Sequence, residues 1–385
     1  MHICLVYDCL FPHTVGGAER WLRHLAERLV ERGHRVTYVT RLQWDPADPP
    51  DIPGVEVVAV SRAEELYDAE GRRRIGQTLR FGRGVLSHLV RHRRSYDVVH
   101  VLSFPYFSLL AARVALAGAP PAVFVEWLEV WSAPYWREYV GGAQAVPARL
   151  VQWLCARATR RAFVFSELNR RRLREAGGAR AEIVKLPGLY TGPLEPYPHV
   201  AGDAPLVAFA GRHIPEKRVP ALVEAIALAR RELPGLRGAI LGDGPERADV
   251  EATVDRLGLS DVVEVAGFVS PEEVHRTLAA ASCVAMPSRR EGYGMVVIEA
   301  AAHGTPVVVC SDEDNAAVEL VEEGVNGFVA PGGEPAQLAE AIVAAVRGGA
   351  ALRESTAAWF AAEAARHSAD ASVAAVLAAY ESART

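Results

Sequence analysis

The sequence has little lysine, few cysteines and no long apolar stretch, and each scarcity excludes a class of protein. Only two of its 42 basic residues are lysines, Lys185 and Lys217. The five cysteines are an odd number without a C-x-x-C pair, which fits reduced thiols and argues against a disulfide scaffold or a zinc knuckle. No apolar run approaches the roughly 20 residues of a membrane-spanning helix. The first residues also lack the basic start and long apolar stretch of a signal peptide. We therefore expect a cytoplasmic protein.

What remains is an ordinary globular composition with an uneven distribution of charge. The 385 residues are 50% hydrophobic and 23% charged, which excludes global disorder and predicts two or three domains of about 100–200 residues each. Residues 1–195 carry 27 basic and 20 acidic side chains, a net +7, whereas residues 196–385 carry 15 and 27, a net −12. This asymmetry indicates two domains with different partners. Because the arginine excess resembles GC-rich coding, it does not indicate a nucleic-acid partner.

Strand and helix patterns alternate along both halves of the chain, with a break between them. Short apolar runs typical of doubly buried strands alternate with helix patterns such as residues 18–32, which predicts mostly parallel, doubly wound sheets. Residues 186–205 contain five prolines and three glycines, which indicates a linker. The sequence thus predicts two Rossmann-like α/β domains with a cleft between them. The predicted parts are an N-terminal domain at 1–187, a linker at 188–204, a C-terminal domain at 205–370 and a C-terminal helix at 371–385 that packs back on the first domain.

The strongest candidate site is the strand–turn–helix segment at residues 287–309. A strand ends at Met286 and a helix begins near Met295, with Glu291 in the turn and Glu299 inside the helix. Glycines in the turn let the backbone approach a ligand, and free N–H groups at a helix start bind an anion or a hydroxyl. A carboxylate accepts hydrogen bonds from neighbouring hydroxyls, so each glutamate suits a polyol. The alternative is that Glu291 only decorates the helix start and that Glu299 lies on a solvated face.

Two weaker candidate segments also follow strands. The segment at residues 211–218 places Arg212 and Lys217 at the carboxyl end of a strand. Two cations there would neutralise a diphosphate, the arginine through a bidentate fork and the lysine as a point charge. The alternative is a solvated basic loop. Near the N-terminus, Gly16 and Gly17 precede a helix, where backbone N–H groups either meet a phosphate or simply form a turn.

In their order along the chain, the glycine pair, the segment at 211–218 and the segment at 287–309 resemble the retaining glycosyltransferases of family 4, which have the GT-B fold. That family has a glycine pair after the first strand, an Arg and Lys pair opening the second domain and an E-x7-E motif, and the resemblance spans almost the whole chain. It implies that Arg212 and Lys217 contact the donor diphosphate. It also implies that Glu299 holds the nucleotide ribose, Glu291 the transferred sugar, and that Phe268 faces the base. The implied nucleotide-sugar site is Gly16, Gly17, Arg212, Lys217, Phe268, Glu291, Gly292, Tyr293, Gly294, Met295, Val296 and Glu299, with Arg212, Lys217 and Glu291 catalytic.

The resemblance also implies a reaction. A retaining transferase would move a sugar from a nucleotide-diphosphate sugar to a hydroxyl acceptor, which is a glycan, a lipid-linked molecule or a small molecule. No metal and no other cofactor would be needed, because cations and helix dipoles neutralise the developing charge. Two alternatives are a GT-B sugar-nucleotide epimerase, which would require an acid pair in the cleft, and a non-catalytic sugar-nucleotide-binding homologue.

One position departs from the family pattern. Where relatives usually have a histidine beside the donor sugar, our alignment places Leu128, between Glu126 and Glu129. A leucine offers no hydrogen bond to a sugar hydroxyl but packs well against a methyl group. This substitution favours a 6-deoxyhexose or pentose donor, unless one of the two glutamates turns inward, and it is also compatible with lost activity. His100, at the end of another strand, either compensates for the missing histidine or is an ordinary core residue.

Two further stretches suggest surfaces. Residues 72–94 are basic with an apolar side, which predicts either a solvated surface helix or peripheral contact with anionic lipid at the inner membrane face. Residues 127–139 contain five aromatic side chains. They form either a wall for a sugar or lipid acceptor or a packed insertion.

Overall fold

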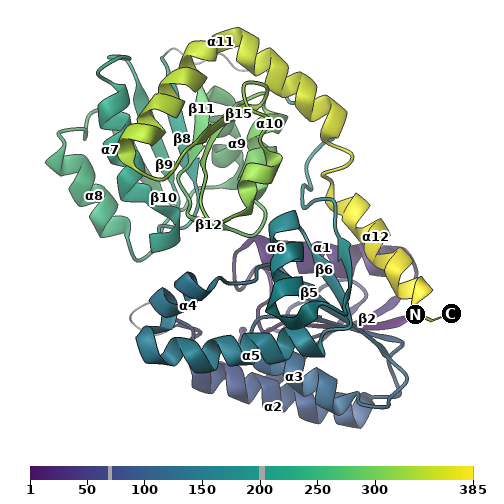
Figure 1. Ribbon diagram of the computed structural model, residues 1–385. Helices are drawn as coiled ribbons and strands as arrows, with labels where there is room; N and C mark the ends of the chain where they lie inside the picture. The colour runs from purple at the N-terminus through teal and green to yellow at the C-terminus, as the bar shows by residue number, and fades with distance from the viewer. Residues whose placement is uncertain (68–71, 199–203, 385) are drawn as a thin grey trace. The chain divides into compact units, whose positions relative to one another are not determined.

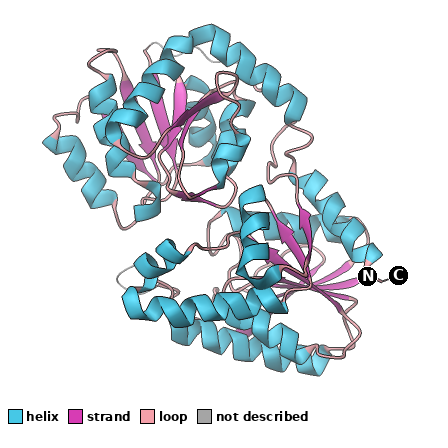
Figure 2. Ribbon diagram, viewed as in Figure 1, coloured by secondary structure: helices cyan, strands magenta, loops and turns pink. Residues whose placement is uncertain are grey.

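The computed structural model describes residues 1–67, 72–198 and 204–384 (Figure 1). The chain divides into two compact units: the first takes in the described residues of 1–189 and 369–385, and the second those of 190–368. Each unit has a parallel sheet with helices on both faces (Figure 2), which confirms the expected doubly wound α/β class. Part of the predicted linker, 199–203, lies outside the described residues. No helix within the described ranges is both long and apolar enough to cross a membrane.

The first unit contains a seven-stranded parallel sheet in the order β3-β2-β1-β4-β5-β6-β7. Its central strands are apolar runs, and every residue of β4 is buried. The strand order reverses between β1 and β4, and ligands of such sheets bind at this switch point, beyond the carboxyl ends of the strands. The strands are β1 (His2–Val6), β2 (Arg35–Arg41), β3 (Val55–Ser61), β4 (Val98–Leu102), β5 (Ala122–Trp127), β6 (Arg161–Val164) and β7 (Glu182–Lys185).

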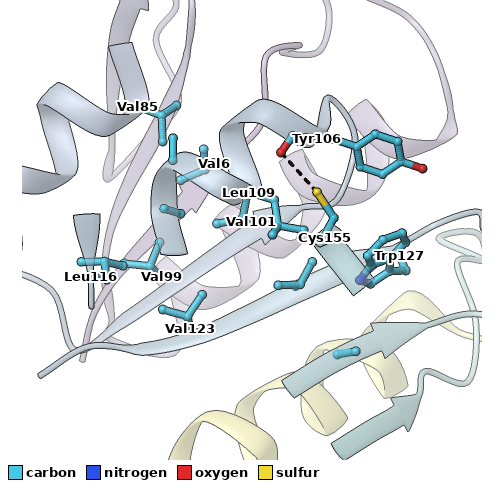
Figure 3. Packing of buried hydrophobic residues seen from close by; sticks show 14 of the residues in the cluster. Val6, Val85, Val99, Val101, Tyr106, Leu109, Leu116, Val123, Trp127 and Cys155 are labelled. Atoms are coloured by element: carbon cyan, nitrogen blue, oxygen red, sulfur yellow. Dashed lines mark hydrogen bonds between the residues drawn. The ribbon is translucent and has the colours of Figure 1, made fainter. Parts of the chain in front are cut away.

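The core of the first unit lies between this sheet and its helices. Figure 3 shows Val99 and Val101 of β4 packed near Leu109, with the thiol of Cys155 donating a hydrogen bond to the carbonyl oxygen of Tyr106 at 3.6 Å. All five cysteines are buried and free, so no disulfide joins them. The helices are α1 (Gly17–Glu31), α2 (Ile75–His92), α3 (Tyr106–Ala115), α4 (Ala133–Val140), α5 (Ala145–Ala158), α6 (Glu167–Leu173) and α12 (Ala369–Ser382).

The last helix, α12, packs on the first unit although it follows the second unit in the sequence. It lies against α1 (Figure 1). The carboxylate of Asp370 pairs with His24 at 3.3 Å and with Arg28 at 2.9 Å. Tyr380, further along α12, is fully buried. The α12 helix therefore supplies both an ion pair and a core side chain to the first unit.

The second unit contains a six-stranded parallel sheet in the order β10-β9-β8-β11-β13-β15, beside a small two-stranded sheet of β12 and β14. Its order reverses between β8 and β11, so this sheet also has a switch point. The strands are β8 (Leu206–Ala210), β9 (Arg237–Leu241), β10 (Val263–Gly267), β11 (Cys283–Met286), β12 (Arg290–Glu291), β13 (Val307–Cys310), β14 (Asp314–Asn315) and β15 (Gly327–Ala330). The helices are α7 (Val219–Ala229), α8 (Arg247–Arg256), α9 (Pro271–Ala280), α10 (Met295–Ala302) and α11 (Pro335–Glu363).

Candidate active site

The turn after β8 is shaped by close backbone contacts. The N–H of Gly211 donates to the carbonyl oxygen of Leu241 at 3.0 Å, at the end of the neighbouring strand β9. Gly242 has a φ of 121°, and a Cβ atom there would lie 1.9 Å from the carbonyl oxygen of Gly211. Only glycine tolerates both conditions. The chain then forms a short 3-10 turn at Pro215–Lys217, which brings Lys217 to the start of α7.

The turn after β11 lies beside the turn after β8. The N–H of Arg289 donates to the carbonyl oxygen of Glu216 at 2.9 Å. The ammonium of Lys217 forms a short ion pair with Oε1 of Glu291, and Ser288 Oγ donates to the same oxygen at 2.8 Å. Lys217 and Glu291, 74 residues apart in the sequence, therefore meet at the switch point of the second unit.

The start of α10 follows directly on this ion pair. Its cap residue, Gly294, has a φ of 101° and cannot supply a side-chain hydrogen bond to the first N–H groups of the helix. A Cβ atom at Gly294 would lie 2.7 Å from the Cβ of Ala317, so the position has room only for glycine. The N–H groups of a helix start favour negative charge. Met295 and Val296, which carry the first of them, are half-buried.

Glu299 lies one turn further along α10 and is half-buried. Burial raises the pKa of the Tyr190 hydroxyl, and the charges of Tyr197 and Glu299 add to this shift. Glu299 therefore contributes to the electrostatics around Tyr190, which is the first residue of the second unit.

Two predicted site residues are exposed. Arg212 is exposed in the turn after β8. Phe268 follows β10, two strands from β8 in the sheet, and its side chain is 76% exposed. The preceding residue, Gly267, accepts a hydrogen bond from the N–H of Gly242 at 2.7 Å, which joins the ends of β9 and β10.

The glycine pair of the first unit begins α1, with Gly16 as its cap. Glu19 folds back over this start, because its Oε2 would lie 2.4 Å from a Cβ atom at Gly16. The hydroxyl of Tyr7, just beyond β1, donates to Glu19 Oε1 at 3.0 Å. Burial raises the pKa of the Glu19 carboxyl. The start of α1 thus already has a carboxylate of the chain beside it.

His100 and Glu126 lie in the core of the first unit rather than on a surface. Both side chains are fully buried, and the ring of His100 is 3.2 Å from Glu126 Oε2. Trp21 Nε1 donates to the same oxygen at 2.9 Å, and Nδ1 of His100 is 2.5 Å from the hydroxyl of Tyr380. Of the two alternatives for His100, this network supports the core residue, and Glu126 is buried with it: the two side chains hold α1 and α12 against the sheet.

Leu128 and Glu129, which follow β5, are half-buried. The carbonyl oxygen of Leu128 accepts a hydrogen bond from Asn169 Nδ2 at 3.0 Å, and Glu129 accepts one from Trp131 Nε1 at 2.9 Å. The neighbouring aromatic side chains pack on one another, as in the T-shaped pair of Trp131 and Tyr135. These contacts are those of a packed insertion.

Family models match both units of the chain. The model described as "Glycosyl transferase 4-like domain" matches residues 16–188, and the model described as "Glycosyl transferases group 1" matches residues 197–358. The chain belongs to the family 4-like glycosyltransferases of the GT-B fold.

Similar proteins agree with this assignment. The glycosyltransferase is 29% identical over 383 residues to a GDP-mannose-dependent alpha-(1-6)-phosphatidylinositol monomannoside mannosyltransferase of Mycobacterium tuberculosis. The alignment covers 91% of this chain and 92% of that protein. The glycosyltransferase is also 34% identical over 140 residues to an alpha-D-kanosaminyltransferase of Streptomyces kanamyceticus, a match that spans only 36% of each chain.

Solved structures share the fold. A sucrose-phosphate synthase of Thermosynechococcus elongatus superimposes with a TM-score of 0.79 and 20% identity, over 99% of this chain and 98% of that one. The Anabaena protein HepE in complex with UDP superimposes with a TM-score of 0.74 and 20% identity, over 99% of this chain and 100% of that one. At such identities the likeness shows the fold alone.

The structure of the glycosyltransferase adds residues to its candidate site that the sequence pattern did not indicate. Ser288 is fully buried and holds Glu291, while Asn315 Nδ2 donates to the carbonyl oxygen of Ser288 at 2.9 Å. His213 is fully buried, and within the described part of the chain neither of its ring nitrogens has a hydrogen-bond partner. The sequence signal for His213 and Ser288 is their position shortly after β8 and β11, because residues at the strand ends of a switch point line ligand sites.

Arg218 is a further addition, marked by its backbone. Among the described residues it is the one non-glycine with a positive φ, 50°. Its guanidinium pairs with Asp312 at 2.8 Å, between the start of α7 and the loop after β13. Residues in such strained conformations cluster at functional sites. Arg218 therefore ties the turn that holds Lys217 to the neighbouring loop.

Proposed function

We propose that this glycosyltransferase is a retaining, metal-independent enzyme that transfers a sugar from a nucleotide-diphosphate sugar to a hydroxyl acceptor. The observation that carries the proposal is the Lys217–Glu291 ion pair beside the glycine-capped start of α10. An ammonium and a row of helix N–H groups together favour a diphosphate. Without a ligand, the carboxylate of Glu291 is the anion that pairs with the Lys217 ammonium.

The roles follow from this arrangement. Lys217 and the exposed Arg212 neutralise the diphosphate as it leaves, which is the charge that a metal ion neutralises in other enzymes. When the diphosphate pairs with Lys217, Glu291 is released to accept hydrogen bonds from the hydroxyls of the transferred sugar. Glu299, one helical turn further along α10, accepts hydrogen bonds from the ribose.

We expect this arrangement to favour retention of the anomeric configuration. After its release from Lys217, Glu291 still accepts a hydrogen bond from Ser288 and is occupied by the sugar hydroxyls, so we do not assign it as the base that an inverting reaction requires. The donor's own phosphate oxygen, held by Lys217, then takes the proton of the acceptor hydroxyl on the face from which the nucleotide leaves.

The experiment is a panel of UDP-, GDP- and dTDP-sugars incubated with candidate hydroxyl acceptors. The anomeric configuration of the product is read by proton NMR, with and without EDTA. We expect the product to keep the donor's anomeric configuration and EDTA to leave the rate unchanged. An inverted product would exclude the retaining reaction, and a rate that EDTA abolishes and Mg²⁺ or Mn²⁺ restores would exclude metal independence.

Leu128 bears on the choice of sugar. Glu126 is held in the core by His100 and Trp21, and so does not turn toward a sugar in place of the missing histidine. A sugar hydroxyl buried against Leu128 would lose a hydrogen bond, at about 1–3 kcal/mol. We therefore expect transfer from a 6-deoxy donor to exceed transfer from its 6-hydroxy parent, and Leu128→His to reverse the preference. Preference of the unmodified enzyme for the parent sugar would contradict this inference.

A further inference from the structure

Three neighbouring helices of the first unit contain no acidic residue. α3 packs against both α2 and α5, so the three helices form one layer (Figure 1). None of the three has an aspartate or a glutamate in its sequence. Their charged residues are arginines and histidines. Arg80 pairs with Glu64, which lies between β3 and α2, and the other arginines give the layer a net positive charge at neutral and acidic pH. The arginines are Arg80, Arg83 and Arg91 of α2, Arg113 of α3, and Arg149 and Arg157 of α5.

The same three helices expose apolar side chains. Among the described residues, twelve large hydrophobic side chains are exposed, and eight of them lie on this layer. The apolar side predicted for residues 72–94 is divided between core and surface, because Val85 and Leu89 are buried whereas Leu79 and Val90 are exposed. The eight are Ile75, Leu79 and Val90 of α2, Val114 of α3, and Val146, Leu150, Trp153 and Leu154 of α5.

The exposed side chains of α5 form one continuous stripe. Val146, Leu150, Trp153 and Leu154 recur at helical spacing and therefore lie on one face of the helix. They are 68%, 54%, 41% and 41% exposed, respectively. Gln152, Cys155 and Ala156 lie on the buried side of the helix, so the stripe is not part of the core.

Cations flank this stripe. The guanidinium of Arg157 lies 5.5 Å from the centre of the Trp153 ring, and Arg149 directly precedes Leu150. Both arginines are exposed. Tryptophan and arginine beside exposed leucine and valine are the side chains of helices that lie in the interface of a bilayer, where apolar groups enter and cations meet phosphates.

We propose that the α5 stripe, defined as Val146, Leu150, Trp153 and Leu154 with Arg149 and Arg157, docks on the surface of an anionic lipid bilayer. The proposal goes beyond the proposed function and does not depend on it. The apolar side chains enter the boundary between headgroups and acyl chains, and the arginines of the layer contact lipid phosphates. A bilayer supplies both the apolar phase and the anions that these three helices lack.

A second copy of the chain fits this surface less well. A two-fold symmetric contact places the same patch on both partners. The acid-free layer would then set arginines against arginines, with no carboxylate from these helices to pair with them. Charge complementarity therefore favours an anionic lipid surface.

The test is co-sedimentation of the full-length protein with vesicles. One set of vesicles is phosphatidylcholine alone, and the other contains about 30% phosphatidylglycerol, an anionic lipid. The wild type should bind the anionic vesicles clearly and the neutral ones weakly, with added salt lowering the binding. The variant Val146→Ser/Leu150→Ser should lower the partitioning about tenfold or more, because it removes apolar groups from the stripe. Both side chains are more than half exposed, so the variant should keep the wild-type Tm.

Matched controls separate the stripe from general surface effects. Leu194→Ser removes an apolar side chain that is 49% exposed in the second unit, and it should leave vesicle binding unchanged. Arg149→Glu/Arg157→Glu should abolish the preference for anionic vesicles, whereas Arg231→Glu/Arg237→Glu, at two exposed positions of the second unit, should keep it.

Three results would overturn the proposal. The wild type would fail to bind anionic vesicles, or the serine variant would bind them as well as the wild type. Alternatively, light scattering would find a dimer that the serine variant abolishes, which would assign the stripe to a second copy. Since vesicle binding requires neither donor nor acceptor, these outcomes are independent of whether sugar transfer is observed.

Discussion

The two units have the same local pattern at their switch points, a strand followed by a glycine turn and a helix start, but different side chains fold over them. In the first unit Glu19, held by Tyr7, lies over the start of α1. In the second unit the ammonium of Lys217 lies beside the start of α10, with Glu291 as its partner. The comparison teaches that the strand–glycine–helix pattern does not by itself specify an anion site. Whether the helix start can bind an anion also depends on the charge of the side chain that lies beside it.

This difference gives the N-termini of α1 and α10 different electrostatic surroundings. An anion approaching α1 would meet a buried carboxylate in place of a cation. In the proposed function, a diphosphate approaching α10 would replace Glu291 as the partner of Lys217. The proposed phosphate site lies within a chain half that carries a net charge of −12, so the proposal requires that the local cations, and not the overall charge, determine the binding.

The largest expected effect concerns Lys217. Lys217→Ala should lower kcat by about 100-fold or more, because it removes the cation that neutralises the leaving group. Lys217→Arg should also be impaired, since a planar fork replaces a compact point charge. The measurement is initial rate with the best donor of the panel, and Lys185→Ala, which alters the other lysine of the chain, is the control. Wild-type rates in the Lys217→Ala variant would end the assignment of the phosphate site.

The next effect compares the two cap glycines. Gly294→Ala should destabilise the protein by about 2–4 kcal/mol, because alanine is strained at φ 101° and its Cβ would overlap Ala317. Gly16→Ala should cost less than about 1 kcal/mol, because its backbone is extended and the flexible carboxylate of Glu19 can move aside. Denaturant unfolding measures both. Equal losses would mean that the two starts are equally constrained.

The pH dependence of stability should report on His303 in the second unit. Burial, with the neighbouring His275 and Arg353, lowers the pKa of His303 to about 4. Between about pH 6.5 and pH 4 the unfolded chain binds a proton that the folded chain does not, so stability falls as the pH drops through this window. The contribution is about 2–3 kcal/mol, fully present above pH 7.

The control for this pH effect is His303→Gln, measured by denaturant unfolding from pH 4.5 to 7.5. The substitution should flatten the curve. It should not abolish the slope, because burial also lowers the pKa of His88 in the first unit to about 4. An unchanged slope in His303→Gln would show that His303 titrates normally in the folded protein.

The smallest effect concerns the strained turn at Arg218. Arg218→Ala keeps the positive φ and loses the pair with Asp312, so it should cost about 1–2 kcal/mol. Arg218→Gly loses the same pair but relaxes the backbone, so it should be more stable than the alanine variant by about 1 kcal/mol. Thermal unfolding of the pair measures the difference. If the alanine variant were the more stable one, the turn would not be strained.

The sequence predicted the parts of the fold that local apolar patterns specify. The buried runs of β1, β4 and β11 read directly as strands, because both faces of each strand are covered. β7 has no such apolar run, because its four residues, Glu182–Lys185, begin and end with exposed charged side chains. The strands of two residues, β12 and β14, are too short to have a pattern.

The side-chain pairings could be predicted only in part. The meeting of Lys217 with Glu291 follows from β8 and β11 being neighbours, which the chain topology implies but the sequence spacing does not. Glu19 lies three residues after its cap glycine, the spacing of a capping box, and this was the signal for its position. The pairing of His100 with Tyr380 joins residues 280 positions apart, and no local pattern indicates it.

The most direct test of the central claim is calorimetric titration of the nucleoside diphosphate that the reaction releases. In the proposed function, Glu299 binds the ribose, Lys217 binds the diphosphate and Glu291 binds the sugar. Glu299→Gln should therefore weaken nucleoside diphosphate binding by about tenfold or more, since it removes a charged hydrogen-bond acceptor. Glu291→Gln should bind the nucleoside diphosphate at least as tightly as the wild type, because Lys217 no longer has a competing carboxylate. Equal weakening in the two variants, or wild-type affinity in Glu299→Gln, would contradict the account.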